Sequence, residues 1–225
     1  MSRTRAWADT ARLVEHLRRG LAGPLPGADA QALMAPRPRP GWRPGPPPGA
    51  ARPAGAVLLL YGSPHGPRLV LTRRAAHLPT HQGQISLPGG ACEPGESPEQ
   101  AARRELAEEL GVPPAAYDLL GALSPLHIPV SGFLLHPFVA FAPARPRLTP
   151  DPGEVAGLLE PSLSELADPA RQRTVFRAHE GRRYRVPLFD VDGEVVWGAT
   201  AMILAELLTV LGAAPRPAPL EEDDR

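Results

Sequence analysis

The prolines restrict what this chain can fold into more than any other feature, because ten of its 31 prolines fall between Pro24 and Pro53. Proline lacks a backbone N–H donor and fixes φ, so it is poorly tolerated inside a helix or a sheet. The sequence therefore predicts an extended linker or a meandering surface segment over residues 24–53. A Pro-rich ligand for a partner domain is the functional alternative. Regular structure is expected to begin at Ala54.

The residues on either side of this segment differ in character. Over residues 1–23, apolar side chains recur at helical spacing, which predicts an amphipathic helix packed on the main domain. They are Trp7, Ala11, Leu13, Val14, Leu17 and Leu21. Because arginines also lie on this helix, binding to a membrane surface is the alternative. Residues 54–212 suffice for one domain, and the Pro-rich, acidic tail over residues 213–225 is expected to be disordered.

Charge and cysteine content narrow the class of protein. The 24 basic residues balance 24 acidic ones, which argues against a nucleic-acid partner. No apolar run approaches the roughly 18 residues of a membrane span, so no membrane partner is expected. Cys92 is the single cysteine, which excludes an intramolecular disulfide and fits a reducing cytoplasm.

Residues 54–212 mix strand and helix patterns without strict alternation. Strands are expected at 54–61, 68–74, 84–87, 117–128, 134–143, 174–189 and 191–198, and helices at 98–110, 161–168 and 199–212. The Asp192-Gly193 pair predicts a hairpin turn. This arrangement favours an α/β fold, with helices packed on a mixed sheet.

The helix at 98–110 has unusually clear limits. Ser97 is expected to be the N-cap, Pro98 suits the first helical position, and Gln100 completes a capping box. At the other end, Gly111 can adopt the left-handed conformation, and Pro113 prevents the helix from continuing.

This helix carries three glutamates on one arc. At 100° per residue, Glu109 lies about 40° from Glu105, and Glu108 lies about 60° in the other direction. The cluster is either a solvated acidic face or a platform for a hard cation such as Mg²⁺ or Mn²⁺. No cation follows Glu105 at i+4, and Gly89 and Gly90 allow backbone to approach a ligand, which supports a cation site. Because acidic helix faces are common, both alternatives stay open at this point.

The segment from Gly90 to Val112 resembles the Nudix box, G-x5-E-x7-R-E-U-x-E-E-x-G-U, where U is a bulky aliphatic residue. The matching residues are Gly90, Glu96, Arg104, Glu105, Leu106, Glu108, Glu109, Gly111 and Val112. The resemblance implies the Nudix fold, a mixed β-sheet in an α/β/α sandwich. It also implies a metal-dependent diphosphohydrolase acting on a nucleoside diphosphate joined to another moiety.

The resemblance also implies roles for individual residues. Glu105 and Glu109 are expected to bind Mg²⁺ or Mn²⁺ with help from Glu108, and a carbonyl of the glycine loop (Gly89, Gly90) to complete the site. Arg104 is expected to orient the carboxylates. The general base is left open between Glu105 and Glu154, a loop residue whose alternative role is an ordinary surface carboxylate.

The stretch before the box resembles the additional motif of coenzyme A pyrophosphatases. The matching residues are Leu71, Thr72, Arg74, Ala75, Gly83, Pro88, Gly89 and Gly90. The resemblance implies coenzyme A or an acyl-coenzyme A as the small-molecule substrate of a cytoplasmic enzyme. A homodimer is one assembly that the sequence leaves open. Arg73 and Arg74 lie on alternate faces of an extended strand, so only one of them can easily point at the site. Arg74, the one that matches the motif, is expected to contact a phosphate of the substrate. A surface charge is the alternative for Arg74. The alternative functions are hydrolysis of ADP-ribose or another nucleoside diphosphate derivative, such as a dinucleotide, and a catalytically silent ligand-binding domain.

Two histidines and the single cysteine are not expected to take part in the chemistry as zinc ligands or as a nucleophile. His77 and His81 are spaced i, i+4 but lack companion ligands, so loop hydrogen bonding or phosphate contact is expected in place of zinc. Cys92 is expected to be a small filler in the glycine loop rather than a nucleophile.

Overall fold

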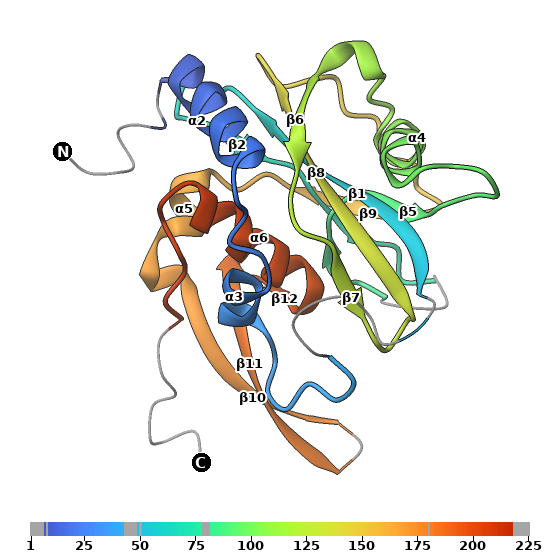
Figure 1. Cartoon of the computed structure of the whole chain (residues 1–225), viewed down its shortest axis with the longest axis vertical. Helices are drawn as coiled ribbons and strands as arrows, with labels where there is room; N and C mark the ends of the chain where they lie inside the picture. Colours follow the sequence, from blue (N-terminus) through green and yellow to red (C-terminus); the bar gives the residue numbers. More distant parts are fainter. Residues whose placement is uncertain are drawn as a thin grey trace.

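The computed structural model describes residues 7, 9–42, 49, 51–77, 82–179 and 181–217 of the chain. Its central strand is β1 (Arg52–Tyr61), which pairs in parallel with β8 (Phe133–Ala142). The other pairings in this sheet are antiparallel, so the sheet is mixed (Figure 1). They involve β2 (Arg68–Leu69), β5 (Gly89–Ala91), β6 (Asp118–Ala122) and β7 (Leu126–Ile128).

Two smaller sheets complete the strands of the described residues. The first has the order β4 (Ile85–Ser86), β3 (Leu71–Arg74), β9 (Val155–Leu159), and the second has the order β10 (Gln172–His179), β11 (Arg182–Val191), β12 (Glu194–Trp197). Between β11 and β12, Asp192 and Gly193 have φ values of 51° and 83°. The hairpin turn predicted there is confirmed.

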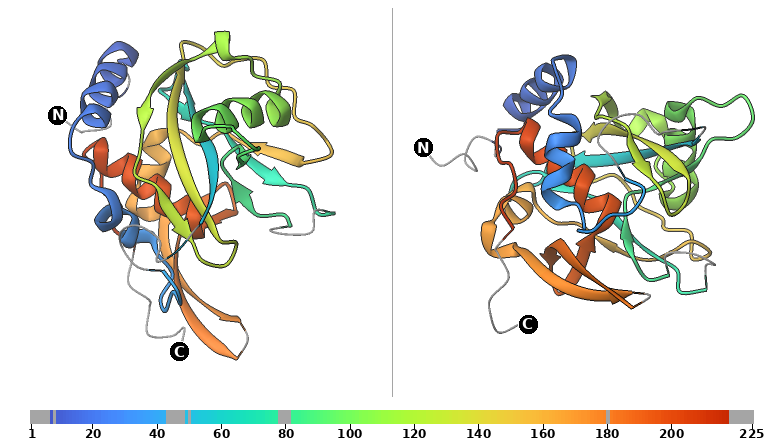
Figure 2. Two further views of the ribbon diagram at one scale, coloured as in Figure 1. Left: turned by 45° about the vertical axis from the view of Figure 1, so that its right-hand side comes forward. Right: turned by 60° about the horizontal axis from the view of Figure 1, so that its bottom comes forward.

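Strand β1 alternates its side chains between two hydrophobic cores. Leu58 and Leu60 belong to the larger core, which includes the buried side chains of α6 (Gly198–Val210). Val57 and Leu59 belong to the second core, together with the apolar residues of α4 (Pro98–Leu110). The helices therefore cover opposite faces of the sheet, as Figure 2 shows, and the predicted α/β/α sandwich is confirmed.

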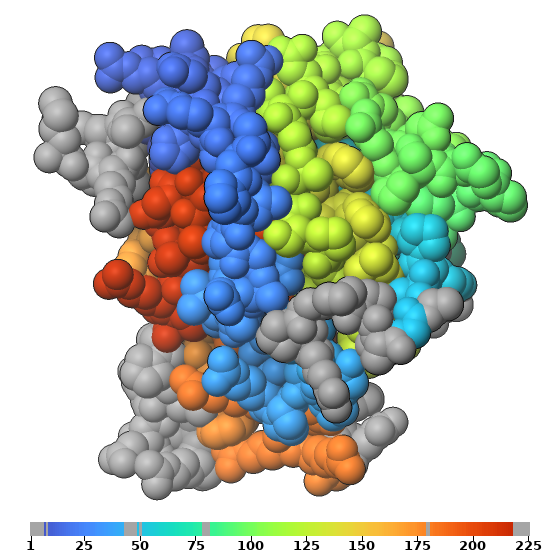
Figure 3. Space-filling view, in the orientation of Figure 1, coloured from blue at the N-terminus to red at the C-terminus, as the bar shows by residue number. Residues whose placement is uncertain are grey.

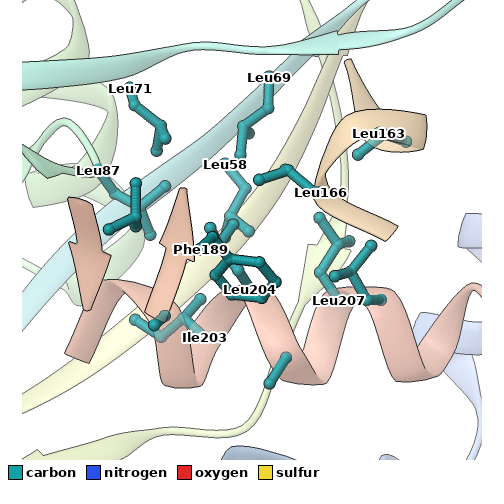
Figure 4. Close-up of a cluster of buried hydrophobic side chains, with 14 of the residues drawn as sticks. Leu58, Leu69, Leu71, Leu87, Leu163, Leu166, Phe189, Ile203, Leu204 and Leu207 are labelled. Atoms are coloured by element: carbon teal, nitrogen blue, oxygen red, sulfur yellow. The ribbon is translucent and has the colours of Figure 1, made fainter. Parts of the chain in front are cut away.

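The larger core joins segments that are far apart in the sequence. Figure 4 shows Leu58 of β1 close to Phe189 of β11 and Leu204 of α6, and all three side chains are fully buried. Leu163 and Leu166 of the short helix α5 (Leu163–Ala167) close one end of this core. Two single turns, η2 (Pro114–Ala116) and η3 (Pro169–Arg171), connect neighbouring elements.

The N-terminal helix packs on the domain as its pattern predicts. α2 (Thr10–Ala22) is capped by Asp9, whose carboxylate accepts a hydrogen bond from the N–H of Arg12 at 3.2 Å. Leu13 and Leu17 are fully buried in the larger core. In Figure 3 the blue residues of this region form a band between the C-terminal segment and the green strands.

The extended linker predicted over residues 24–53 is corrected by the structure. It contains α3 (Gly27–Gln31) and the turn η1 (Ala32–Met34), and Met34 is fully buried. The prediction fails because the prolines occupy permitted positions. Pro26 precedes the first helical residue of α3, and Pro53 lies near the start of β1, where its carbonyl accepts a hydrogen bond from Cys92 N–H at 3.0 Å. Residues 43–48 and 50 lie outside the described residues.

The C-terminal tail is also packed over its first residues, against the prediction of disorder from residue 213. Pro215 is buried, and the N–H of Arg216 donates to the side-chain oxygen of Gln172 at 2.6 Å. Residues 218–225 lie outside the described residues. Among the helices that the structure describes, none is long and apolar enough to cross a membrane.

Candidate active site

The glutamate-bearing helix has the limits that its caps predict. α4 spans Pro98–Leu110, Ser97 and Gln100 form the reciprocal capping box, and Gly111 ends the helix with φ of 67°. These local interactions fix the rotation of α4 about its axis and so the direction of each glutamate.

Glycines bring this helix unusually close to the sheet. At Gly55 of β1 a Cβ atom would overlap the carbonyl oxygen of Pro98 and lie 2.8 Å from the backbone nitrogen of Ala102. At Gly90 of β5 a Cβ atom would overlap the carboxylate of Glu105. Gly55 was not recognised from the sequence, although a glycine inside a strand pattern is a signal of close backbone approach.

Glu109 is the most buried of the acidic residues on α4, with 3% of its surface exposed. Burial raises its pKa to about 8, and the charges of Glu105 and Glu154 act in the same direction. The charge of Arg74 and a hydrogen bond from the backbone of Gly89 oppose this rise. The buried Oε2 of Glu109 has no hydrogen-bond partner among the described residues.

Glu154 completes a group of three carboxylates. One oxygen each from Glu105, Glu109 and Glu154 lie within 4.8 Å of one another. Glu154 precedes β9, and its carbonyl accepts a hydrogen bond from Ala75 N–H at 2.8 Å at the end of β3. Burial also raises the pKa of Glu105, and the nearby Arg104 opposes that rise. Residues from two distant parts of the sequence thus form one acidic site.

Arg104 organises a second set of carboxylates, which lie on α4 and in the loop before it. Its Nε and Nη2 donate to the two oxygens of Glu96 at 3.0 Å each, and its Nη1 donates to Glu105 at 2.8 Å and to Glu108 at 2.9 Å. Glu96 has its pKa lowered, chiefly by this arginine. Glu108 is 60% exposed and is not one of the three carboxylates that converge. The structure therefore pairs Glu108 with Arg104, while Glu105 belongs to both sets.

The two neighbouring arginines of β3 take different directions. Arg73 donates to Glu194 of β12. Arg74 lies beside the acidic site, since its charge lowers the pKa of Glu109. The register between β3 and β9 shifts after Arg73, so that Arg74 lies opposite Val155, the residue after Glu154. The Nε of Arg74 is buried without a hydrogen-bond partner among the described residues.

The other candidate residues stay outside the acidic site. His77 is exposed and is not part of a metal-ligand cluster in the described part of the chain, and His81 lies outside the described residues. Cys92 is partly buried, and burial raises its pKa, which disfavours the nucleophilic thiolate.

The three converging carboxylates fit a hard divalent cation. Their ligand atoms are all oxygens. Mg²⁺, Mn²⁺ and Ca²⁺ prefer oxygen ligands, whereas zinc more often binds nitrogen and sulfur. The unpartnered Oε2 of buried Glu109 is the independent sign, because a buried carboxylate oxygen ordinarily has a partner. A cation at this position would also remove the repulsion that raises the pKa of Glu109.

The chain is similar to known proteins over more than half of its length. The model of the NUDIX domain matches residues 51–179. Proteins described as uncharacterized Nudix hydrolase NudL, from Yersinia pestis (strain Pestoides F) and Yersinia pseudotuberculosis serotype O:1b (strain IP 31758), are each 38% identical over 153 residues. The match covers 68% of this chain and 76% of each relative. The crystal structure of RenU, a Nudix hydrolase from M. smegmatis, has a TM-score of 0.52 at 21% identity, covering 75% of this chain and 91% of that chain.

Proposed function

Because this chain belongs to the Nudix family of hydrolases, whose members act on nucleoside diphosphate derivatives, we propose that its substrate is coenzyme A or a coenzyme A thioester. Hydrolysis of the diphosphate bond would release 3′-phospho-AMP and 4′-phosphopantetheine, or acyl-4′-phosphopantetheine from a thioester. The observation that carries the hydrolytic part of the proposal is the convergence of Glu105, Glu109 and Glu154 within 4.8 Å.

The proposed cofactor is Mg²⁺ or Mn²⁺, held by Glu105, Glu109 and Glu154. When bound, such a cation neutralises charge on the diphosphate and lowers the pKa of a water molecule. Glu109 is the strongest candidate ligand, because its Oε2 is buried and unpartnered. Glu105 accepts a hydrogen bond from Arg104 at 2.8 Å, and its carboxylate lies against Gly90, where a Cβ atom would overlap it. Glu108 supports the site indirectly through its own bond to Arg104.

The general base is proposed among the same carboxylates. Glu154 is the more exposed member of the three, so it can reach a water molecule from the solvent side. Glu105 accepts a hydrogen bond from Arg104, so its carboxylate is less free to reach a water molecule. We therefore favour Glu154 over Glu105 for proton abstraction.

Arg74 is proposed to bind a phosphate of the substrate. Its buried Nε has no hydrogen-bond partner in the part of the chain that the structure describes, and its charge acts on Glu109. Arg74 also belongs to the stretch that resembles the coenzyme A motif. Gly90 borders the same site, because a Cβ atom there would overlap the carboxylate of Glu105. The neighbouring Gly89 lets the backbone pass close to Gly55 and Ala56 of β1. Coenzyme A also carries a 3′-phosphate, which an arginine can bind through paired donors.

Substrate competition tests the proposal. The ratio kcat/KM would be measured for coenzyme A, dephospho-coenzyme A and ADP-ribose, with Mg²⁺ and with Mn²⁺, and 3′-phospho-AMP identified as product. A charged hydrogen bond to the 3′-phosphate contributes about 1.5–3 kcal/mol, so coenzyme A should exceed dephospho-coenzyme A by about 10- to 150-fold. ADP-ribose should be poorer still.

Variants of the two arginines test whether Arg74 itself causes the preference for coenzyme A, or whether the loss of any positive charge has the same effect. Arg74→Ala should reduce the preference for coenzyme A over dephospho-coenzyme A. Arg73→Ala is the matched control, because Arg73 donates to Glu194, and it should keep the preference. Equal rates of the parent protein on coenzyme A and ADP-ribose would contradict the coenzyme A proposal and favour the ADP-ribose alternative. Metal-dependent release of any of these products excludes a catalytically silent domain.

A further inference from the structure

Three pairs in the described residues have a capping side chain followed three positions later by Gln or Glu. They are Ser97 with Gln100, Asp151 with Glu154, and Ser162 with Glu165. In two of them the longer side chain folds back onto the backbone N–H of the capping residue. Gln100 accepts from Ser97 N–H at 2.8 Å, and Glu165 accepts from Ser162 N–H at 2.7 Å. This reciprocal pattern is the capping box.

The pair Asp151 and Glu154 starts in the same way but ends differently. The carboxylate of Asp151 accepts a hydrogen bond from Gly153 N–H at 2.9 Å, and its carbonyl accepts from Glu154 N–H at 3.1 Å and Val155 N–H at 2.8 Å. The N–H of Asp151, however, donates to the carbonyl of Glu109 at 2.9 Å. The bond that would hold the Glu154 side chain on its own turn is therefore replaced, and its carboxylate faces Glu105 and Glu109 instead.

Main-chain hydrogen bonds anchor this turn on both sides of the acidic site. Thr149 N–H donates to the carbonyl of Leu110 at 2.8 Å, next to the bond from Asp151 to Glu109. Both bonds use carbonyls that a helix C-terminus leaves without an intrahelical partner. Ala75 N–H fixes the carbonyl of Glu154 to β3. Of the described residues in this loop, Asp151 contributes the side chain that closes the turn.

We propose that Asp151 is a positioning residue that holds the carboxylate of Glu154 against Glu105 and Glu109. The proposal rests on the proposed metal role of these three residues, and it deepens that role. Asp151 acts through geometry, by accepting the hydrogen bond from Gly153, so an amide oxygen at the same position should serve as well as a carboxylate.

Binding of Mn²⁺ to the metal-free protein tests this directly, with free Mn²⁺ measured by electron paramagnetic resonance. Glu154→Gln should weaken binding because a charged ligand is lost. Asp151→Ala should weaken it by about 2- to 12-fold, the effect of one backbone hydrogen bond. Asp151→Asn should keep most of the parent affinity. In the Asp151→Ala/Glu154→Gln double variant the affinity should equal that of Glu154→Gln alone, because Asp151 then has no carboxylate to position.

Asp168 provides a matched control elsewhere in the fold. It also precedes a proline, and its carboxylate accepts from Ala170 N–H at 3.0 Å, in the same turn geometry as Asp151 and Gly153. Arg171 occupies the place that corresponds to Glu154, and its N–H donates to the Asp168 carbonyl at 3.0 Å. Asp168→Ala should lower the Tm about as much as Asp151→Ala while leaving the Mn²⁺ affinity unchanged.

The outcomes separate the positioning role from its alternatives. Parent-like Mn²⁺ affinity in Asp151→Ala overturns the proposal. Equal losses in Asp151→Ala and Asp151→Asn overturn it in favour of a charge effect, and additive losses in the double variant show that Asp151 does not act through Glu154. If the predicted affinity differences appear but coenzyme A is not hydrolysed, the positioning role is supported and the substrate proposal alone fails.

Discussion

Removal of metal should make the stability of this protein fall as the pH rises, because of one buried glutamate. The pKa of Glu109 is about 8 in the folded protein, against an ordinary value of 4.5. Below pH 4.5 the group is protonated in both the folded and the unfolded state and has no effect. Between the two values the folded protein retains a proton that the unfolded chain has released. Stability is therefore lost progressively through this window as the pH rises.

The magnitude follows from the shift. Between pH 6 and pH 8 the free energy of unfolding should decrease by about 2 kcal/mol on account of Glu109. For a protein of this size that corresponds to a decrease in Tm of about 4–8 °C. The raised pKa of Glu105 acts in the same direction, whereas His136, whose pKa is lowered by burial, opposes it near the acidic end of the range.

Thermal unfolding in EDTA at pH 6, 7 and 8 measures this effect, and a variant isolates it. Glu109→Gln cannot ionise, so the pH dependence should be flatter by about 2 kcal/mol, and the variant should be more stable than the parent at pH 8. Glu93→Gln changes an exposed glutamate of the preceding loop and should leave the parent slope. Saturating Mg²⁺ or Mn²⁺ should restore stability at pH 8 in the parent but not in Glu109→Gln. If Glu109→Gln keeps the pH dependence of the parent protein, the attribution of that dependence to this carboxylate is refuted.

Three further perturbations test other parts of the argument. The fully buried carboxylate of Glu206 accepts hydrogen bonds from Gly27 N–H, Ser124 N–H and the Gln31 amide. Glu206→Gln should therefore destabilise the fold by about 1.5–3 kcal/mol in denaturant unfolding. Parent-like stability would show that these bonds contribute nothing. In Gly55→Ala the new methyl group overlaps the Pro98 carbonyl and should shift α4. The free energy of unfolding should fall by about 1–3 kcal/mol or more, and kcat should fall as well. An active, fully stable variant would contradict the close packing. Deletion of residues 1–42 should give an unstable or insoluble product, whereas a stable and active product would show that these residues are a dispensable spacer.

The parts of the fold that the sequence predicts well are those set by neighbouring residues. The limits of α4 depend on Ser97, Gln100 and Gly111, which lie within or next to the helix. The turn at Asp192-Gly193 is equally local. The linker prediction failed because proline was treated as excluding structure, whereas Pro26 and Pro53 lie at positions where no N–H is needed. The burial of Met34 depends on contacts that no local pattern contains.

The same distinction between local and tertiary effects applies to the candidate site. Helical geometry places Glu105, Glu108 and Glu109 on one arc, but their separation into two groups depends on the surroundings of the helix. Arg104 takes Glu108 together with Glu96, while the burial of Glu109 under the loop at Asp151 draws Glu109 toward Glu154. The arc alone cannot distinguish these two directions.

Glu105 connects the two groups, and this connection links the structural and the proposed chemical roles of the helix. It accepts a hydrogen bond from Arg104 at 2.8 Å and also lies among the three converging carboxylates. Arg104 therefore balances part of the negative charge at the site from one side, and a bound cation would balance it from the other. Since Arg104 is shared among Glu96, Glu105 and Glu108, loss of Glu96 would free the arginine to draw Glu105 away from Glu109 and Glu154. Glu105 is thus held by Arg104 on one side and would be held by the proposed cation on the other.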